Sequence, residues 1–188
     1  AYDGSDPVGI GKSLATFSAF AEGVSLYSAF AVLYSFQMRN LLKGVGQQMK
    51  WSVRDESLHS KMGCQLFRHM CSQIPGLKEE CKEHVYDAAL TMHNAEMTYI
   101  SKLFEMGDIE GITEYDLKHF IKKRTGDKIK ELGYKPEGKF KFEYDQKSID
   151  KMAWFDHLTG GHTHTDFFAI RPTDYSKANE GEDFEDVW

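Results

Sequence analysis

Glu56 and His59 are the two residues whose types and spacing are most suited to chemistry. They lie three positions apart in residues 51–62, a segment without glycine or proline. On a helix, residues at this spacing share one face, so a carboxylate and an imidazole can reach one metal ion. Glu-x-x-His is a ligand motif of di-iron and di-manganese helical bundles. The motif also occurs by chance on solvated helices, so it is informative only with a further ligand.

Glu22 is the candidate for that further ligand. It is the only acidic residue in residues 7–54, and it lies within the apolar run of residues 17–36. A carboxylate buried in such a run needs compensation for its charge. A metal ion would provide it, and the alternative is an ion pair with Arg54 or Lys61. The sequence therefore predicts that Glu22 joins the Glu-x-x-His pair on a metal.

Residues near these candidates have either a supporting or an ordinary role. Asp55 could orient a metal-bound histidine, or it could be a surface acid beside Arg54. Leu26 and Phe30 follow Glu22 at helical spacing, so we expect them to form apolar walls of the site as well as part of the core.

Other acid and histidine residues carry less weight. Asp116 and His119 repeat the spacing of the motif, but they lie in a lysine-rich segment that we interpret as a solvated face. His84, His93 and Glu96 lack a matching buried acid, and we expect structural roles for them.

Composition excludes several classes of protein. The net charge of -6 argues against a general nucleic-acid binder. The three cysteines have no zinc-site spacing and indicate buried thiols in a reducing compartment, so we expect a cytoplasmic protein. Residues 17–36 have the length of a membrane span. Because they include Glu22, Gly23 and four serines, we expect a helix inside a bundle and no membrane span.

Helical periodicity predicts an all-α fold. After an irregular lead-in at residues 1–12, a helical domain covers residues 13–158, with Ser13 as the first N-cap and Thr113 as the last. The long helices are expected at about residues 13–42, 47–72, 77–106 and 114–132, followed by an extended segment or hairpin at 134–147 and a short helix at 149–158.

Residues 159–188 form a predicted flexible tail that becomes strongly acidic from Asn179 onward. It ends with Phe184, Val187 and Trp188 among acids, which is typical of a short docking segment. The alternative is a tail that binds nothing. Tyr175, at the root of the acidic part, would by itself be an exposed anchor.

Five segments together resemble the small subunit of class I ribonucleotide reductase: FAEGVSLYSAF, WSVRDESLH, EECKEHVYDA, GITEYDLKHFIKKR and THTDFFAIRPTDYSKA. The resemblance implies a ferritin-like helical bundle with a dinuclear Fe/Fe, Mn/Mn or Mn/Fe centre. It also implies a dimeric small subunit that makes a radical or other oxidising equivalent. The large catalytic subunit would use it for deoxyribonucleotide synthesis.

The resemblance also assigns roles to residues. Glu22, Glu56 and His59 would be metal ligands, and Asp55 and Tyr175 would transfer the radical. The segment containing Phe184, Val187 and Trp188 would dock on the large subunit. Ser52 departs from the pattern, since a bulkier apolar residue is often found there, and it would make the oxygen pocket more polar.

The resemblance covers only the C-terminal half of the family's bundle. The family's remaining Asp, its other Glu-x-x-His and its radical tyrosine have no counterpart in the sequence. We therefore expect a split or fragmented subunit that needs an N-terminal-half partner. One alternative is a self-complementing homodimer, acting as a di-iron oxidase or a metal store, since two copies would provide a full ligand set. The other is a non-catalytic helical scaffold with a docking tail.

Overall fold

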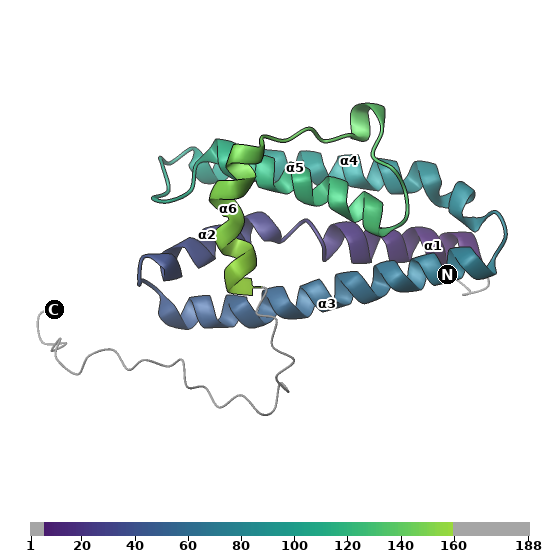
Figure 1. Ribbon diagram of the computed structural model, residues 1–188, viewed down its shortest axis with the longest axis horizontal. Coiled ribbons are helices and arrows are strands. Elements are labelled where there is room, and N and C mark those ends of the chain that lie inside the picture. The colour runs from purple at the N-terminus through teal and green to yellow at the C-terminus, as the bar shows by residue number, and fades with distance from the viewer. Residues whose placement is uncertain (1–5, 160–188) are drawn as a thin grey trace, which may run out of the picture.

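The computed structural model describes residues 6–159, with side chains described for residues 6–156 (Figure 1). Within that part there is no β-strand, only an isolated bridge between Ile109 and Ile112, so the all-α prediction is confirmed. The elements are α1 (Pro7–Ala15), the π-helix η1 (Thr16–Ala21), α2 (Tyr27–Met38), α3 (Lys43–Gln73), α4 (Leu77–Phe104), α5 (Glu114–Glu131), the 3-10 helix η2 (Gly138–Phe140) and α6 (Gln146–Thr159).

The predicted start of the first helix is wrong. The carboxylate of Asp6 accepts a hydrogen bond from the Val8 backbone N–H at 3.0 Å, and Pro7 occupies the first turn. Asp6 is therefore the N-cap, and proline is well suited to the first helical position. Residues 7–12 are helical rather than irregular, and Ser13 lies inside the helix.

The predicted single helix over residues 13–42 is divided. After α1 the chain forms the π-helical turn η1, and residues 22–26 are turns before α2 begins. The next break lies at Asn40 and Leu42, whose φ angles are 64° and 48°. Residues 43–46, which lie between the predicted helices 13–42 and 47–72, belong to the first turn of α3. None of the helices in the described part of the chain is long and apolar enough to cross a membrane.

The later helices agree closely with prediction. Thr113 caps α5 as expected, because its hydroxyl accepts a hydrogen bond from the Asp116 backbone N–H at 3.0 Å. Gly76, with a φ of 83°, precedes α4. Residues 134–145 form no hairpin; they are irregular apart from η2.

Figure 1 shows the arrangement of the helices: α3 runs along one long side, α4 and α5 along the other, and α1 and α2 lie between them. Helix α6 crosses from α5 toward α3. Its buried Phe155 packs edge-on against Tyr27 and Tyr34 of α2 and Phe120 of α5, at centroid distances of 5.3–6.1 Å. These aromatic contacts place the core between α3 on one side and α4 and α5 on the other. They also fix α2, the helix that follows the turn containing Glu22.

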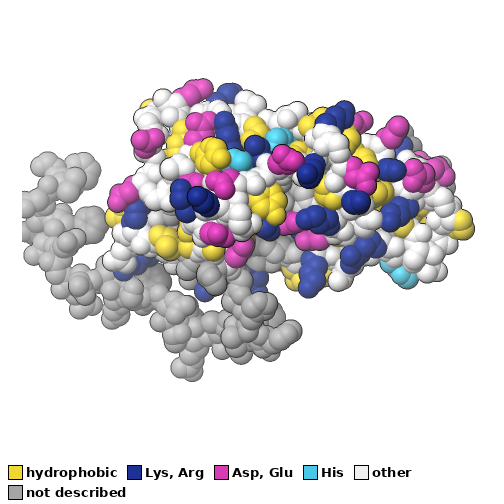
Figure 2. Space-filling model, turned by 45° about the horizontal axis from the view of Figure 1, so that its top comes forward, with side chains coloured by type: hydrophobic (Ala, Val, Ile, Leu, Met, Phe, Trp, Pro, Cys, Tyr) yellow, Lys and Arg dark blue, Asp and Glu magenta, His cyan; other side chains and the backbone are white. Residues whose placement is uncertain are grey.

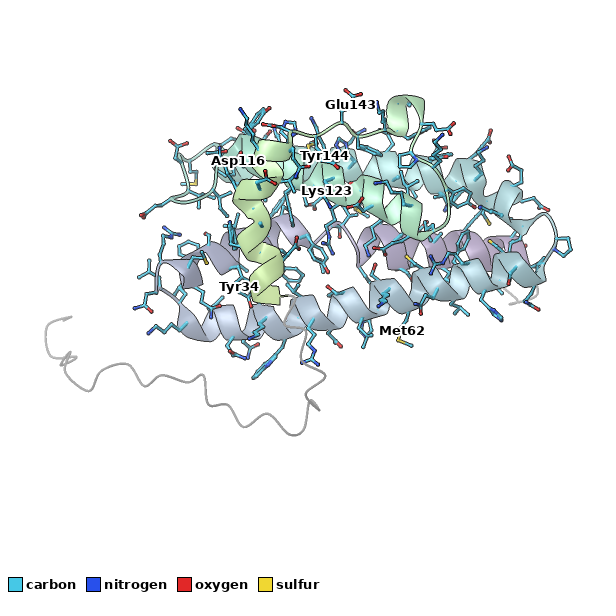
Figure 3. All side chains as sticks on the ribbon, in the orientation of Figure 1. Tyr34, Met62, Asp116, Lys123, Glu143 and Tyr144 are labelled. Atoms are coloured by element: carbon cyan, nitrogen blue, oxygen red, sulfur yellow. The ribbon has the colours of Figure 1, made fainter. Side chains whose placement is uncertain are left out.

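Asp116 is not on a solvated face, which corrects the sequence interpretation. It is 5% exposed and lies where α5 meets α6 (Figure 3). Its carboxylate accepts hydrogen bonds from the hydroxyls of Ser148 at 2.7 Å and Thr113 at 2.8 Å, and from Lys151 Nζ at 3.2 Å. Burial alone would raise the pKa of Asp116, but these hydrogen bonds outweigh it and lower the pKa.

We expect Asp116→Ala to lower the free energy of unfolding by about 2 kcal/mol, because it leaves Ser148 without its buried partner. Urea unfolding followed by circular dichroism measures the loss. The lowered pKa makes this contribution present above the unfolded pKa and lost as pH falls through the folded one, so the difference should shrink below about pH 4. Asp108→Ala, at an exposed position, is the control; an equal loss there would contradict the prediction.

Candidate metal centre

Glu22 is positioned by the π-helix η1. Its backbone N–H donates to the carbonyl of Phe17, five residues earlier, at 2.9 Å, which is the π-helical pattern. Single π-turns that interrupt α-helices are frequent at functional sites. The π-helix ends at Ala21 and Glu22 is its C-cap, so Glu22 stands at the start of the break. Its side chain is partly buried rather than fully enclosed.

Glu56 and His59 lie on one face of α3, as predicted. The distance between Glu56 Oε2 and His59 Nδ1 is 3.9 Å, and the side chains are 27% and 51% exposed. One ligand atom each from Glu22, Glu56 and His59 lies within 4.8 Å of the other two. The structure therefore brings together the three residues that the sequence singled out, from η1 and α3.

This group of donors fits a divalent transition metal. Carboxylate and imidazole donors lie about 2.1 Å from such ions, so two donors on opposite sides of one ion are about 4.2 Å apart. The ligand atoms of Glu22, Glu56 and His59 lie within 4.8 Å of one another, which exceeds that distance only slightly. Small movements of these side chains would bring the atoms to the distance that one ion requires. Two carboxylates and one imidazole suit both iron and manganese, and three donors leave positions open for further ligands.

Asp55 lies on the exposed side of the same helix turn. Its Oδ1 is 3.7 Å from His59 Nε2, and its side chain is 69% exposed. This places a carboxylate beside the second nitrogen of the histidine, where it can orient the ring. Ser52, one turn before Glu56, is partly buried.

Leu26 and Phe30 were expected to line the site because they would share a face with Glu22 on one continuous helix, but the helix is interrupted. Because residues 22–26 leave the helix, Leu26 is 42% exposed while Phe30 is buried, with its ring 5.6 Å from that of Tyr27. The two residues therefore lie in different environments, and their role as walls of the site stays a prediction. Tyr175, Phe184, Val187 and Trp188 lie outside the described residues.

Sequence reasoning missed Arg124, which supports the site from α5. Its Nε donates to the carbonyl of Gly23, next to Glu22, at 2.6 Å. Its guanidinium lies 3.1 Å from the centroid of the Tyr27 ring, and the Tyr27 hydroxyl bonds the Ser57 hydroxyl at 2.8 Å. These contacts join the two ligand-bearing segments. The lysine-rich sequence around Arg124 carried no signal for this role.

An exposed apolar stripe runs along α3 beside the site. It consists of Trp51, Leu58, Met62 and Leu66, whose exposed fractions lie between 49% and 60%. Met62 points away from the other helices (Figure 3). The spacing of these residues gives one helix face, so α3 presents apolar groups on the side opposite its own bundle. Contiguous apolar surface of this kind marks an interaction site.

Comparison with known proteins places the chain in a family. The family model of the ribonucleotide reductase small chain matches residues 2–140. The chain belongs to this family. A probable ribonucleoside-diphosphate reductase small subunit of Invertebrate iridescent virus 3 is 32% identical over 179 residues, which cover 90% of this chain and 44% of the viral protein. Another, from Invertebrate iridescent virus 6, is 27% identical and covers 95% of this chain and 55% of its own length.

A subunit beta of the same reductase from Chlamydia pneumoniae is 23% identical, over 89% of this chain and 46% of that protein. The chain thus spans about half the length of these curated relatives. Ribonucleotide reductase small subunits are ferritin-like helical bundles, and the all-helical structure agrees with that fold. The family normally has a dinuclear metal centre, is typically dimeric and works with a large catalytic subunit.

Proposed function

We propose that this chain provides half of the ligands of a dinuclear iron or manganese centre in a ribonucleotide reductase small subunit. The centre would generate the radical or oxidising equivalent that the large catalytic subunit uses to make deoxyribonucleotides. The observation that supports this most is the convergence of Glu22, Glu56 and His59 within 4.8 Å in a member of that family.

The proposed roles follow from the chemistry of each group. Glu56 and His59 bind from one rigid helix, and Glu22 binds from η1, so the three approach the ions from two directions. Binding requires ionised carboxylates and a neutral imidazole, and Asp55 would hold that imidazole by accepting its other N–H. When bound, iron or manganese supplies one-electron redox chemistry.

Three donors are fewer than a dinuclear centre needs. We propose that the remaining ligands come from helices outside these 188 residues, equivalent to the N-terminal half of the family's bundle, either as a split partner or as a missing segment. The apolar stripe on α3 supports this proposal, because helices packed there would cover it beside the ligands. Tyr175 would relay the radical. The segment with Phe184, Val187 and Trp188 would bind the large subunit.

A second copy of the chain is the competing partner. A lone glutamate plus Glu-x-x-His, doubled by symmetry, makes the ligand set of designed di-iron bundles, and a second copy would also cover the apolar stripe. That arrangement would give a homodimeric oxidase or metal store. It differs from the split subunit because it needs no other polypeptide.

Metal binding tests these proposals. We expect the lone chain to bind Mn²⁺ weakly, and the chain with a polypeptide carrying the other ligands to bind about two ions per site, as measured by electron paramagnetic resonance and elemental analysis. Two ions per dimer of the lone chain would instead show the self-complementing bundle. No metal in either preparation would leave a scaffold with a docking tail.

Glu22→Gln tests the ligand assignment. The amide keeps the shape of the side chain but loses the charge, so we expect Mn²⁺ affinity to fall more than tenfold, since even supporting residues cost about 10- to 100-fold. Circular dichroism should show the helices unchanged. Glu83→Gln, on an exposed face of α4, is the matched control. Equal Mn²⁺ affinity for Glu22→Gln and the unaltered chain would rule Glu22 out as a ligand.

A further inference from the structure

A groove of about 500 Å³ lies between α3, α5 and α6. Five cationic side chains line it: Lys61 and Arg68 from α3, and Lys123, Arg124 and Lys128 from α5. Figure 2 shows basic and acidic side chains interspersed over one face of the molecule, and Lys123 is labelled on α5 in Figure 3. The concentration of positive charge is unusual for a chain whose net charge is -6.

Two of these cations are neutralised by neighbours on their own helix. Lys123 Nζ lies 2.6 Å from Asp127 Oδ2, and Lys128 Nζ lies 2.7 Å from Glu131 Oε2. Both carboxylates also line the groove. These pairs therefore contribute no net charge to it.

The other three cations have no such partner. Among the described side chains, no carboxylate lies within ion-pair distance of Lys61, Arg68 or Arg124, and Asp156 is the only further acid lining the groove. Burial raises the pKa of the Cys64 thiol to about 11, so that lining residue is neutral near pH 7. The groove thus carries an excess of two positive charges.

Arg124 is held in place before any ligand binds. Its Nε donates to the Gly23 carbonyl, and its guanidinium is stacked on the Tyr27 ring. Its two terminal nitrogens make no hydrogen bond within the described part of the chain, and the residue lines the groove. A guanidinium fixed in this way loses little entropy when it binds an oxyanion.

Part of the remaining wall of the groove is apolar, and the polar Ser57 and Gln65 also line it. Phe120, Ile149 and Met152 line it beside the cations. Ligand sites of small molecules have volumes of about 300–1,000 Å³ and combine apolar walls with a few convergent polar groups, and this groove has both properties. Arginine and lysine together suit phosphate groups, which accept several charge-assisted hydrogen bonds.

We propose that this groove binds a small phosphate monoester with an apolar body, which carries close to two negative charges near pH 7. A dianion compensates the excess of two charges, whereas a monocarboxylate would leave one cation without a partner. The proposal uses none of the three candidate metal ligands, so it can be tested without metal, although Arg124 contacts both the groove and the residue next to Glu22.

Isothermal titration of the full chain with phenyl phosphate, in metal-free buffer of low ionic strength, tests the proposal. We expect one site per chain. Lys61→Gln and Arg68→Gln should each weaken binding about tenfold or more, as the loss of a charge-assisted hydrogen bond does. Lys50→Gln, on α3 but outside the groove lining, should leave affinity within about twofold once salt screening is matched.

Three results would overturn the proposal. The first is no heat of binding at millimolar ligand. The second is equal weakening by Lys50→Gln and Lys61→Gln, which would show diffuse attraction to surface charge. The third comes from a chain in which Glu180, Glu182, Asp183, Glu185 and Asp186 are changed to amides. If only that variant binds the ligand, the chain's own acidic segment occupies the groove in the unaltered protein. If the variant and the unaltered chain bind the ligand equally, the result supports a small-molecule site.

Discussion

Gly63→Ala should lower the free energy of unfolding by about 2 kcal/mol or more, an overpacking cost. A methyl group at Gly63, in the middle of α3, would overlap the Cβ and hydroxyl of Ser18 in η1, and it would lie 3.6 Å from Leu14 Cδ1. Ser18 is buried, so it has little room to move away. Alanine normally favours a helix by about 1 kcal/mol over glycine, and the expected loss is what remains after that gain.

The same substitution should weaken Mn²⁺ binding. Glu22 follows η1 directly, while Glu56 lies about two turns and His59 about one turn before Gly63 on α3, so pushing the two elements apart separates the donors. Urea unfolding and Mn²⁺ titration measure the two effects. Removing the opposing side chain with Ser18→Gly in the same protein should recover part of both losses, since residues in contact couple energetically.

Gly44→Ala provides the matched control in the same helix. Apart from the adjacent residues and the backbone of its own helix, no described atom lies within 4 Å of a methyl group placed there, so we expect unchanged Mn²⁺ affinity and a small gain in stability. If Gly63→Ala behaved like Gly44→Ala, α3 and η1 would not be packed as closely as the structure indicates.

The features that local sequence determines were predicted well. Thr113 and Gly76 mark helix boundaries through their own side-chain or backbone properties, and α4 and α5 begin where those residues predict. The spacing of Glu56 and His59 fixes their shared face wherever the helix lies. The convergence of Glu22 on them could be proposed because an isolated acid in an apolar run needs a partner.

The features that depend on contacts between distant segments were not predictable. The π-turn before Glu22 interrupts a run whose composition favours a continuous helix, and Gly23 alone gives little warning of it. Gly23 leaves no room for a side chain, because a methyl group there would lie 2.7 Å from both Lys128 Cε and Ser60 Oγ. That packing, between residues far apart in the chain, defines the break.

Burial of charged residues was also hidden in the sequence. Asp116 lies among lysines, which is the pattern of a solvated face, yet α6 covers it with Ser148. Glu96 lies in a polar stretch of α4, yet α2 covers it with Ser28. In both cases the partner is a serine on another helix, and serine carries no pattern that marks it as the partner of a buried acid.

Among the acids in the described part of the chain, Glu96 is the one whose substitution by glutamine should change the pH dependence of stability most. Glu96 is 5% exposed, and the hydroxyl of the fully buried Ser28 donates to its Oε2. Burial raises the pKa of Glu96 from 4.5 to about 7, although hydrogen bonds from Ser28 oppose the shift. The folded protein therefore keeps this proton at pH values where the unfolded chain releases it.

The difference between the folded and unfolded pKa values of Glu96 determines how the free energy of unfolding changes with pH. The contribution of a raised carboxyl pKa is present below the unfolded value of about 4.5 and is lost as pH rises toward 7, and a shift of this size corresponds to about 3 kcal/mol. Glutamine stays neutral at every pH. Relative to the unaltered protein, Glu96→Gln should thus gain stability steadily between pH 4.5 and 7 and hold that gain at pH 8.

Free energies of unfolding from urea titrations at pH 4, 5.5, 7 and 8 measure this difference, and Glu83→Gln on the exposed face of α4 shows the effect of removing an ordinary surface acid. A difference between Glu96→Gln and the unaltered protein that stays constant with pH would mean that Glu96 titrates normally and is not enclosed by α2. A rising difference would identify Glu96 as a buried acid that α2 holds in its protonated form, and would locate a pH-sensitive contact between α4 and α2.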